Sequence, residues 1–136
     1  MHTLDINGIW QLAPLDSHAI APHCSYFLDH PFIPCTLPGD IHTALLDHGL
    51  IVDPFVGTNE LAMQWVGQAD WLLEKTFTIT EEDLHSGRAH LSFTMADTMI
   101  TVMVNGQAIG SMYNQFRRWR FDIHDALTLG ENTITL

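Results

Sequence analysis

Three carboxylates in a loop-rich stretch, Asp53, Glu60 and Asp70, come closest to an arrangement that could do chemistry. Two carboxyl groups about 5 Å apart can divide the roles of acid/base and nucleophile between them. Carboxylates on loops more often stay solvated or cap a helix, and nothing in the spacing forces these three together. We therefore predict that the chain carries no catalytic pair of its own.

Nine histidines and two cysteines raise the question of a bound metal. The spacings that typify zinc sites, HExxH, HxH and paired CxxC, do not occur in the sequence. We expect no metal ion and no cofactor, and interpret His18, His23 and His30 as solvated loop residues. Because the sequence shows no sign of secretion, Cys24 and Cys35 are expected to be reduced thiols.

The composition indicates a folded and strongly acidic domain. The 136 residues are 46% hydrophobic, and the formal charge is −11 with only five Lys plus Arg. Nucleic acid is excluded as a partner, because phosphate binding needs a broad basic surface. No apolar run reaches the roughly 18 residues of a membrane span, and residues 1–10 lack the basic and apolar regions of a secretory signal. We therefore expect a cytoplasmic protein that binds no membrane.

One short helix is predicted, over about residues 40–48. Asp40 can accept hydrogen bonds from the unpaired N–H groups of a first helical turn. Ile41 and Leu45 follow at helical spacing. Gly49 then supplies a left-handed stop.

Strands are predicted over most of the remaining chain. Apolar residues at strand spacing mark residues 4–12, 71–80, 91–95, 99–104, 116–123 and 133–136. Asn105-Gly106 gives the strongest hairpin signal, because both turn positions need positive φ. Five prolines between residues 13 and 38 exclude a long helix and disfavour a central strand there. Many short strands with Gly and Asn turns predict an all-β sandwich or jelly roll.

Short motifs follow one another in a fixed order along nearly the whole chain. The first set is Leu37-Pro38-Gly39-Asp40-Ile41-His42-Thr43, Asp53-Pro54-Phe55, Asn59-Glu60, Gln64-Trp65 and Asp70-Trp71. The second set is Val104-Asn105-Gly106, Phe116-Arg117-Arg118, Phe121-Asp122-Ile123 and Gly130-Glu131-Asn132. The first set resembles the opening of a β-mannosidase of glycoside hydrolase family 2, and the second resembles the sugar-binding domain of that family. Leu73 departs from the pattern, since an aromatic residue is usual at this place.

The resemblance implies a galactose-binding-domain-like jelly roll with one short helix. It implies a longer enzyme that hydrolyses terminal non-reducing β-D-mannose residues with retention, using two glutamates in a TIM barrel. A barrel of roughly 250 residues cannot fit in this chain. Residues 1–136 are therefore expected to be the non-catalytic amino-terminal domain, to stop before its last strands, and to support the downstream barrel. A Trp-Asp segment that shapes the family's pocket would also lie beyond Leu136.

Four residues are the candidates for contact with substrate or with another domain: Trp65, Asp70, Asn59 and Glu60. Tryptophans can stack on sugar rings, but Trp10, Trp71 and Trp119 occupy core-compatible strand positions. Trp65 lies outside any clear period, so both an exposed and a buried side chain are consistent with the sequence.

Two alternatives to the accessory domain stay open. Jelly rolls also serve as stand-alone carbohydrate-binding modules, since a fold does not establish a function. The same domain also belongs to family 2 β-galactosidases and β-glucuronidases, although the stretch from Asp53 to Trp71 favours the mannosidases.

Overall fold

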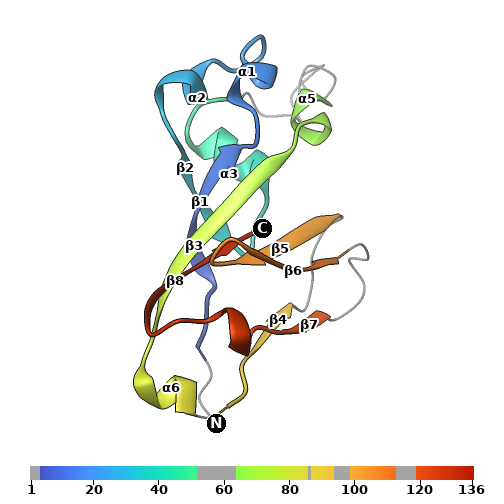
Figure 1. Ribbon diagram of the computed structural model, residues 1–136. Helices are drawn as coiled ribbons and strands as arrows, with labels where there is room; N and C mark the ends of the chain where they lie inside the picture. Colours follow the sequence, from blue (N-terminus) through green and yellow to red (C-terminus); the bar gives the residue numbers. More distant parts are fainter. Residues whose placement is uncertain (1–3, 52–63, 86, 94–98, 113–118) are drawn as a thin grey trace. The chain divides into compact units, whose positions relative to one another are not determined.

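A computed structural model describes residues 4–51, 64–85, 87–93, 99–112 and 119–136 (Figure 1). The chain divides into two compact units, and each is described here by itself. The first unit is Asn7–Leu73, and the second is Glu74–Leu136 together with Met1–Ile6. In the described ranges, no helix is long and apolar enough to cross a membrane.

The first unit is built on an antiparallel strand pair. Strand β1 (Gly8–Pro14) pairs with β2 (Ile33–Leu37), so that Trp10 lies opposite Cys35. In β1, Trp10 and Leu12 are buried, whereas Ile9 is 67% exposed. This alternation is expected of a strand that has one face covered. Pro34 has no N–H to donate to a ladder, which suits a strand at a sheet edge. The prolines between residues 13 and 38 disfavoured a central strand, and β2 does lie at the edge of its sheet.

The predicted helix is confirmed as α3 (Ile41–Asp47). The Asp40 Oδ1 atom accepts a hydrogen bond from the Thr43 N–H at 2.7 Å and so caps the first turn. Gly49 ends the helix with a φ of +68°, and the Leu50 N–H donates to the Leu45 carbonyl at 2.9 Å. The buried Leu45 anchors the helix on the core.

Further short helices lie outside the single predicted one. They are α1 (Ser17–Ile20), α2 (Tyr26–Asp29), α5 (Gln64–Gln68), α6 (Glu81–His85) and the 3₁₀ turn η1 (His124–Ala126). The helix α6 follows directly after β3 (Trp71–Ile79), where no helix is predicted from the sequence. Thr80 and Asp83 exchange hydrogen bonds there, with Asp83 Oδ2 accepting from the Thr80 N–H at 3.0 Å and Thr80 Oγ1 accepting from the Asp83 N–H at 3.3 Å. Elements of three to five residues are too short to show a helical period.

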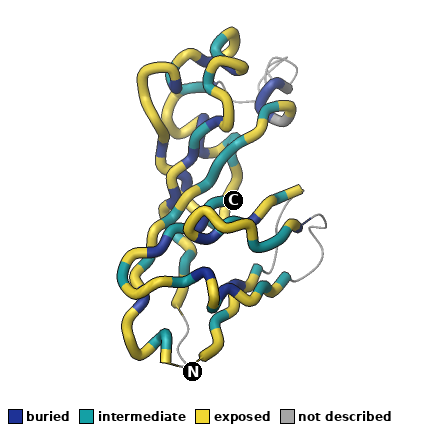
Figure 2. The backbone as a smooth tube through the Cα atoms, in the orientation of Figure 1, coloured by how far each residue is buried: buried dark blue, intermediate teal, exposed yellow. Residues whose placement is uncertain are grey.

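The core of the first unit joins the helices α1, α2, α3 and α5 to the strand pair (Figure 2). Its buried members are Leu12, Ile20, Cys24, Phe27, Ile33, Cys35, Ala44, Leu45, Ile51, Trp65 and Val66. Each of these four helices contributes at least one side chain, so helices that are marginal by themselves are held by tertiary packing.

The second unit contains two layers of antiparallel strands. Strand β3 (Trp71–Ile79), whose first three residues belong to the first unit, pairs with β8 (Gly130–Thr135). β8 pairs with β5 (Ile100–Val104), and β5 pairs with β6 (Gln107–Met112). The other layer is β4 (His90–Phe93) with β7 (Trp119–Asp122). The predicted hairpin at Asn105-Gly106 is confirmed by positive φ at both residues.

The two layers approach closely at Gly110. A Cβ atom placed on Gly110 in β6 would lie 2.8 Å from the Phe121 ring in β7, so only glycine fits without a shift. Phe121 in turn stacks on Trp119 with the ring centroids 6.2 Å apart. Strands in packed layers, joined by turns, confirm the predicted all-β sandwich class.

A buried amide closes the second unit. Asn132 in β8 is 1% exposed. Its Oδ1 atom accepts from the Thr128 N–H at 2.8 Å, and its Nδ2 group donates to the carbonyls of Thr128 at 2.8 Å and Gly130 at 3.0 Å. The side chain therefore satisfies main-chain groups that the bend before β8 would otherwise leave unpaired.

Asn105 extends this arrangement across the β5–β6 turn. Its Nδ2 group donates to Asn132 Oδ1 and to the Ala126 carbonyl, both at 2.8 Å. Its Oδ1 atom accepts from the Thr133 N–H at 2.9 Å, and its own N–H donates to the Thr133 carbonyl at 2.8 Å. The hydrogen bonds of these two side chains are called the Asn105–Asn132 network below. The network ties η1, β8 and the β5–β6 turn together.

Replacing Asn132 is expected to be the most damaging polar substitution in the described part of the second unit. Asn132→Ala should lower the free energy of unfolding by about 2–4 kcal/mol, because the buried amide and the main-chain groups of Thr128 and Gly130 lose their shared hydrogen bonds. Asn132→Asp should also destabilise, since an oxygen would replace the donor that faces two carbonyls. Urea unfolding followed by far-ultraviolet circular dichroism measures both. Exposed Glu131→Gln is the matched control, expected within about 0.5 kcal/mol of the unsubstituted chain. An Asn132→Ala chain as stable as this control would contradict the role given to the network.

Substitutions at the two ends of α3 are expected to change the free energy of unfolding less than Asn132→Ala does, and in opposite directions. Asp40→Ala should lower the free energy of unfolding by about 1 kcal/mol, whereas Asp40→Asn, which keeps an acceptor oxygen, should cost much less. Asp47 lies at the opposite end of α3, where a negative charge is unfavourable, so Asp47→Asn should be neutral or slightly stabilising. Equal losses for Asp40→Asn and Asp40→Ala would show that the cap does not act through its hydrogen bond.

Candidate functional site

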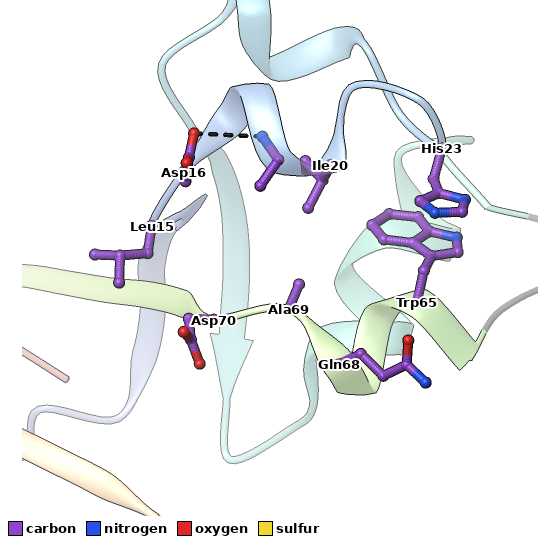
Figure 3. A pocket seen from close by; sticks show the side chains of 9 residues that line it. Leu15, Asp16, Ile20, His23, Trp65, Gln68, Ala69 and Asp70 are labelled. Atoms are coloured by element: carbon purple, nitrogen blue, oxygen red, sulfur yellow. Dashed lines mark hydrogen bonds between the residues drawn. The ribbon is translucent and has the colours of Figure 1, made fainter.

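A hollow of about 270 Å³ lies in the first unit (Figure 3). The residues that line it come from the end of β1, from α1 and the turn after it, and from α5 and the approach to β3. They are Leu15, Asp16, Ala19, Ile20, His23, Trp65, Gln68, Ala69 and Asp70. This hollow contains two of the four candidate residues predicted from the sequence, Trp65 and Asp70.

Local hydrogen bonds hold the walls of the hollow. Asp16 Oδ1 accepts from the N–H groups of His18 at 3.0 Å and Ala19 at 3.3 Å and so caps α1. The Leu15 N–H donates to the Asp70 carbonyl at 2.9 Å, which joins the end of β1 to the residue before β3. The backbone of Asp70 therefore has a structural role, while its side chain is exposed.

One wall of the hollow is an aromatic stack. The His23 and Trp65 rings are nearly parallel, with centroids 5.4 Å apart. Trp71 packs against Trp65 and Phe27, with ring centroids 6.2 Å and 6.1 Å away. The Trp71 Nε1–H donates to the Val66 carbonyl at 2.9 Å, so its buried polar atom is satisfied. The rings thus link α2, α5 and β3 within the first unit.

The structure decides between the two alternatives for Trp65. The side chain is only 8% exposed, because His23 covers one face of the ring and the core covers the rest. Trp65 offers no open face for a sugar ring in this structure. The contact with His23 could not be found from the sequence, since 42 positions and no shared period separate the two residues.

The remaining candidates lie elsewhere. Asn59 and Glu60 fall outside the described residues, as does Asp53. Of the three carboxylates considered at the outset, only Asp70 lies in the part of the chain that the structure describes.

The titratable side chains that line the hollow are Asp16, His23 and Asp70. Figure 3 shows the Ile20 and Ala69 side chains facing its interior, while the Gln68 and Asp70 side chains point away from α1. Asp16 is occupied with its cap. The geometry suits contact with a small apolar group better than proton transfer. In the described ranges, no group of three or more His, Cys, Asp or Glu side chains is placed to hold a metal ion.

A second hollow, of about 260 Å³, lies between β1, β2 and α3. It is lined by Ile9, Pro34, Thr36, Asp40, Thr43, Ala44, Asp47 and His48. Cys35 lies beside it in β2 and, like Cys24, is a buried free thiol. Burial raises the pKa of the Cys35 thiol, and the negative charge of Asp40 raises it further. A thiol held protonated in this way is a weak nucleophile, so Cys35 is a core residue rather than a reactive one.

Relatives of the chain share its sequence over most of its length. A probable β-mannosidase of Caenorhabditis elegans is 38% identical over 101 residues, which cover 74% of this chain and 11% of that protein. β-Mannosidase B of Thermothelomyces thermophilus is 36% identical over 109 residues, covering 79% of this chain and 13% of that protein. The chain thus spans about a tenth of the length of these relatives.

Solved structures extend the similarity to the fold. The crystal structure of the β-D-mannosidase from Dictyoglomus thermophilum matches with a TM-score of 0.86 and 34% identity, over 99% of this chain and 15% of that one. The exo-chitosanase from Amycolatopsis orientalis matches with a TM-score of 0.76 at 20% identity, which shows the fold alone.

The family model described as "Glycosyl hydrolase 2 galactose-binding domain-like" matches residues 10–136. That range includes both strand layers of the second unit, the helix α3 and the aromatic wall of the hollow. The chain therefore belongs to the galactose-binding domain-like family of glycosyl hydrolase 2, and its relatives in that family are β-mannosidases.

Proposed function

We propose that this chain is the amino-terminal accessory domain of a retaining β-mannosidase. The similarity to the Dictyoglomus thermophilum β-D-mannosidase over 99% of this chain carries the proposal, because both its identity and its TM-score are well above those of the β-glucuronidases. Those β-glucuronidases match at 17–19% identity and support the fold alone.

The proposed reaction takes place outside these 136 residues. Retaining hydrolysis needs two carboxyl groups about 5 Å apart, one as acid/base and one as nucleophile. The hollow of the first unit holds one carboxylate used as a helix cap and one that points away, so it supplies no such pair. The domain's contribution is structural: it supports a downstream catalytic barrel that acts on terminal β-D-mannose residues.

The burial of tryptophan disfavours the alternative of a stand-alone carbohydrate-binding module. Such modules present exposed aromatic rings to the sugar face. All four tryptophans lie in the described ranges, and none is exposed: Trp10 and Trp65 are buried, and Trp71 and Trp119 are half-buried.

The free thiols Cys24 and Cys35 suit a reducing compartment, so a cytoplasmic location is part of the proposal.

The whole open reading frame that contains this chain is expected to release 4-nitrophenol from 4-nitrophenyl β-D-mannopyranoside. Its kcat/KM on the matching β-D-galactopyranoside and β-D-glucuronide should be lower by at least about a hundredfold. Proton NMR of the first product should show the β-anomer, as retention requires. The 136-residue chain alone, as the control, should release no 4-nitrophenol. A preference for the galactoside or glucuronide, or an inverted product, would overturn the assignment.

Calorimetry of the 136-residue chain separates the accessory domain from a binding module. Titration with mannose and with mannobiose at millimolar concentration should give only heats of dilution, because none of the four tryptophans presents an exposed ring. Saturable heat with either sugar would favour the binding-module alternative.

A further inference from the structure

The turn between β5 and β6 carries a chemically labile sequence, Asn105-Gly106. The main-chain nitrogen of a residue that follows asparagine can attack the side-chain amide carbon, and glycine, without a Cβ, obstructs that approach least. At this turn a bond would form between Gly106 N and Asn105 Cγ, and the Cγ–Nδ2 bond would break. The Gly106 amide proton passes to the departing Nδ2 group, which leaves as ammonia. Water then opens the five-membered ring and leaves aspartate or isoaspartate at position 105.

The folded structure opposes the first step of this reaction. For the attack, the Asn105 side chain must turn its Cγ atom toward the Gly106 nitrogen. Its Nδ2 group is held by acceptors at 2.8 Å on Ala126 and Asn132, and its Oδ1 atom is held by the Thr133 N–H at 2.9 Å. Rotation therefore breaks three hydrogen bonds at once, each worth about 1 kcal/mol.

Access of water does not limit the reaction. Asn105 and Gly106 are both exposed, so solvent reaches the turn in the folded state. What is restricted is the orientation of the amide. The barrier added by folding is thus the free energy of opening the Asn105–Asn132 network, a local event that need not unfold the rest of the unit.

The product would not fit the network. An aspartate at position 105 has no donor for the Ala126 carbonyl or for Asn132 Oδ1, and its negative charge would face both of these acceptors. Isoaspartate would add a main-chain atom to a tight turn as well. Once Asn105 is modified, the turn cannot re-form the two hydrogen bonds that its Nδ2 group donated.

We propose that Asn105 is a site of spontaneous hydrolytic deamidation, gated by opening of the Asn105–Asn132 network and irreversible in its effect on that network. The unsubstituted chain protects Asn105, and loss of Asn132 exposes it.

Peptide mapping by mass spectrometry after incubation at mildly alkaline pH tests the gate. The reference is a synthetic peptide spanning Met103–Ala108, in which nothing holds the side chain. Asn105 in the folded chain should be modified at least about tenfold more slowly than in the peptide, the ratio expected if opening costs more than one hydrogen bond. Asn132→Ala should move the rate toward that of the peptide, whereas exposed Glu131→Gln should leave it unchanged. Equal rates in chain and peptide, or in Asn132→Ala and Glu131→Gln, would overturn the proposal.

A second measurement serves if Asn132→Ala does not fold. In unsubstituted chain at urea concentrations below the unfolding transition, the deamidation rate should rise in parallel with hydrogen exchange of the Thr133 amide, which belongs to the same network. A deamidation rate that stays constant while this exchange accelerates would contradict gating. Asn105→Asp, which mimics one product, should unfold at lower urea than the unsubstituted chain, and an unchanged midpoint would contradict the irreversible effect.

Discussion

The second unit depends on the burial of one side-chain amide. Asn132 is almost fully enclosed, and a buried amide without partners would cost more than most single contacts contribute. Each of its polar atoms is instead matched to a main-chain group or to Asn105. Because the partners belong to the β5–β6 turn and to the bend that leads into β8, the amide is satisfied only where these segments meet. The network therefore specifies geometry as much as it adds stability.

Long periodic elements were predicted well from the sequence. The strand over residues 71–80, the helix capped by Asp40 and the turn at Asn105-Gly106 all follow from local chemistry, and the structure confirms each. In these places the pattern, the cap and the turn residues indicate the same element, which is why prediction succeeds.

The parts that prediction missed depend on contacts between distant residues. Helices of three to five residues show no period, so only their caps could have indicated them; the Thr80 and Asp83 pair was such a signal. The burial of Trp65 follows from His23 and from packing around Trp71, which the order of residues does not encode locally. From the sequence, Asn132 was noted only as part of the Gly130-Glu131-Asn132 motif, and the hydrogen bond that it accepts from the distant Asn105 became visible only in the structure. Of the candidate site, the sequence indicated Trp65 and Asp70 but could not show that their side chains differ in exposure.

The distribution of aromatic residues between the two units has a spectroscopic consequence. Trp10, Trp65 and Trp71 belong to the first unit, and Trp119 alone belongs to the second. Trp65 lies against both His23 and Trp71, so the emission of Trp65 and Trp71 responds to disruption of the aromatic wall. Intrinsic fluorescence of this chain is thus weighted toward one unit and reports poorly on the other. Loss of the Asn105–Asn132 network should therefore change the total emission of the chain only slightly. The component of that emission that reports on the second unit comes from Trp119, which stacks on Phe121.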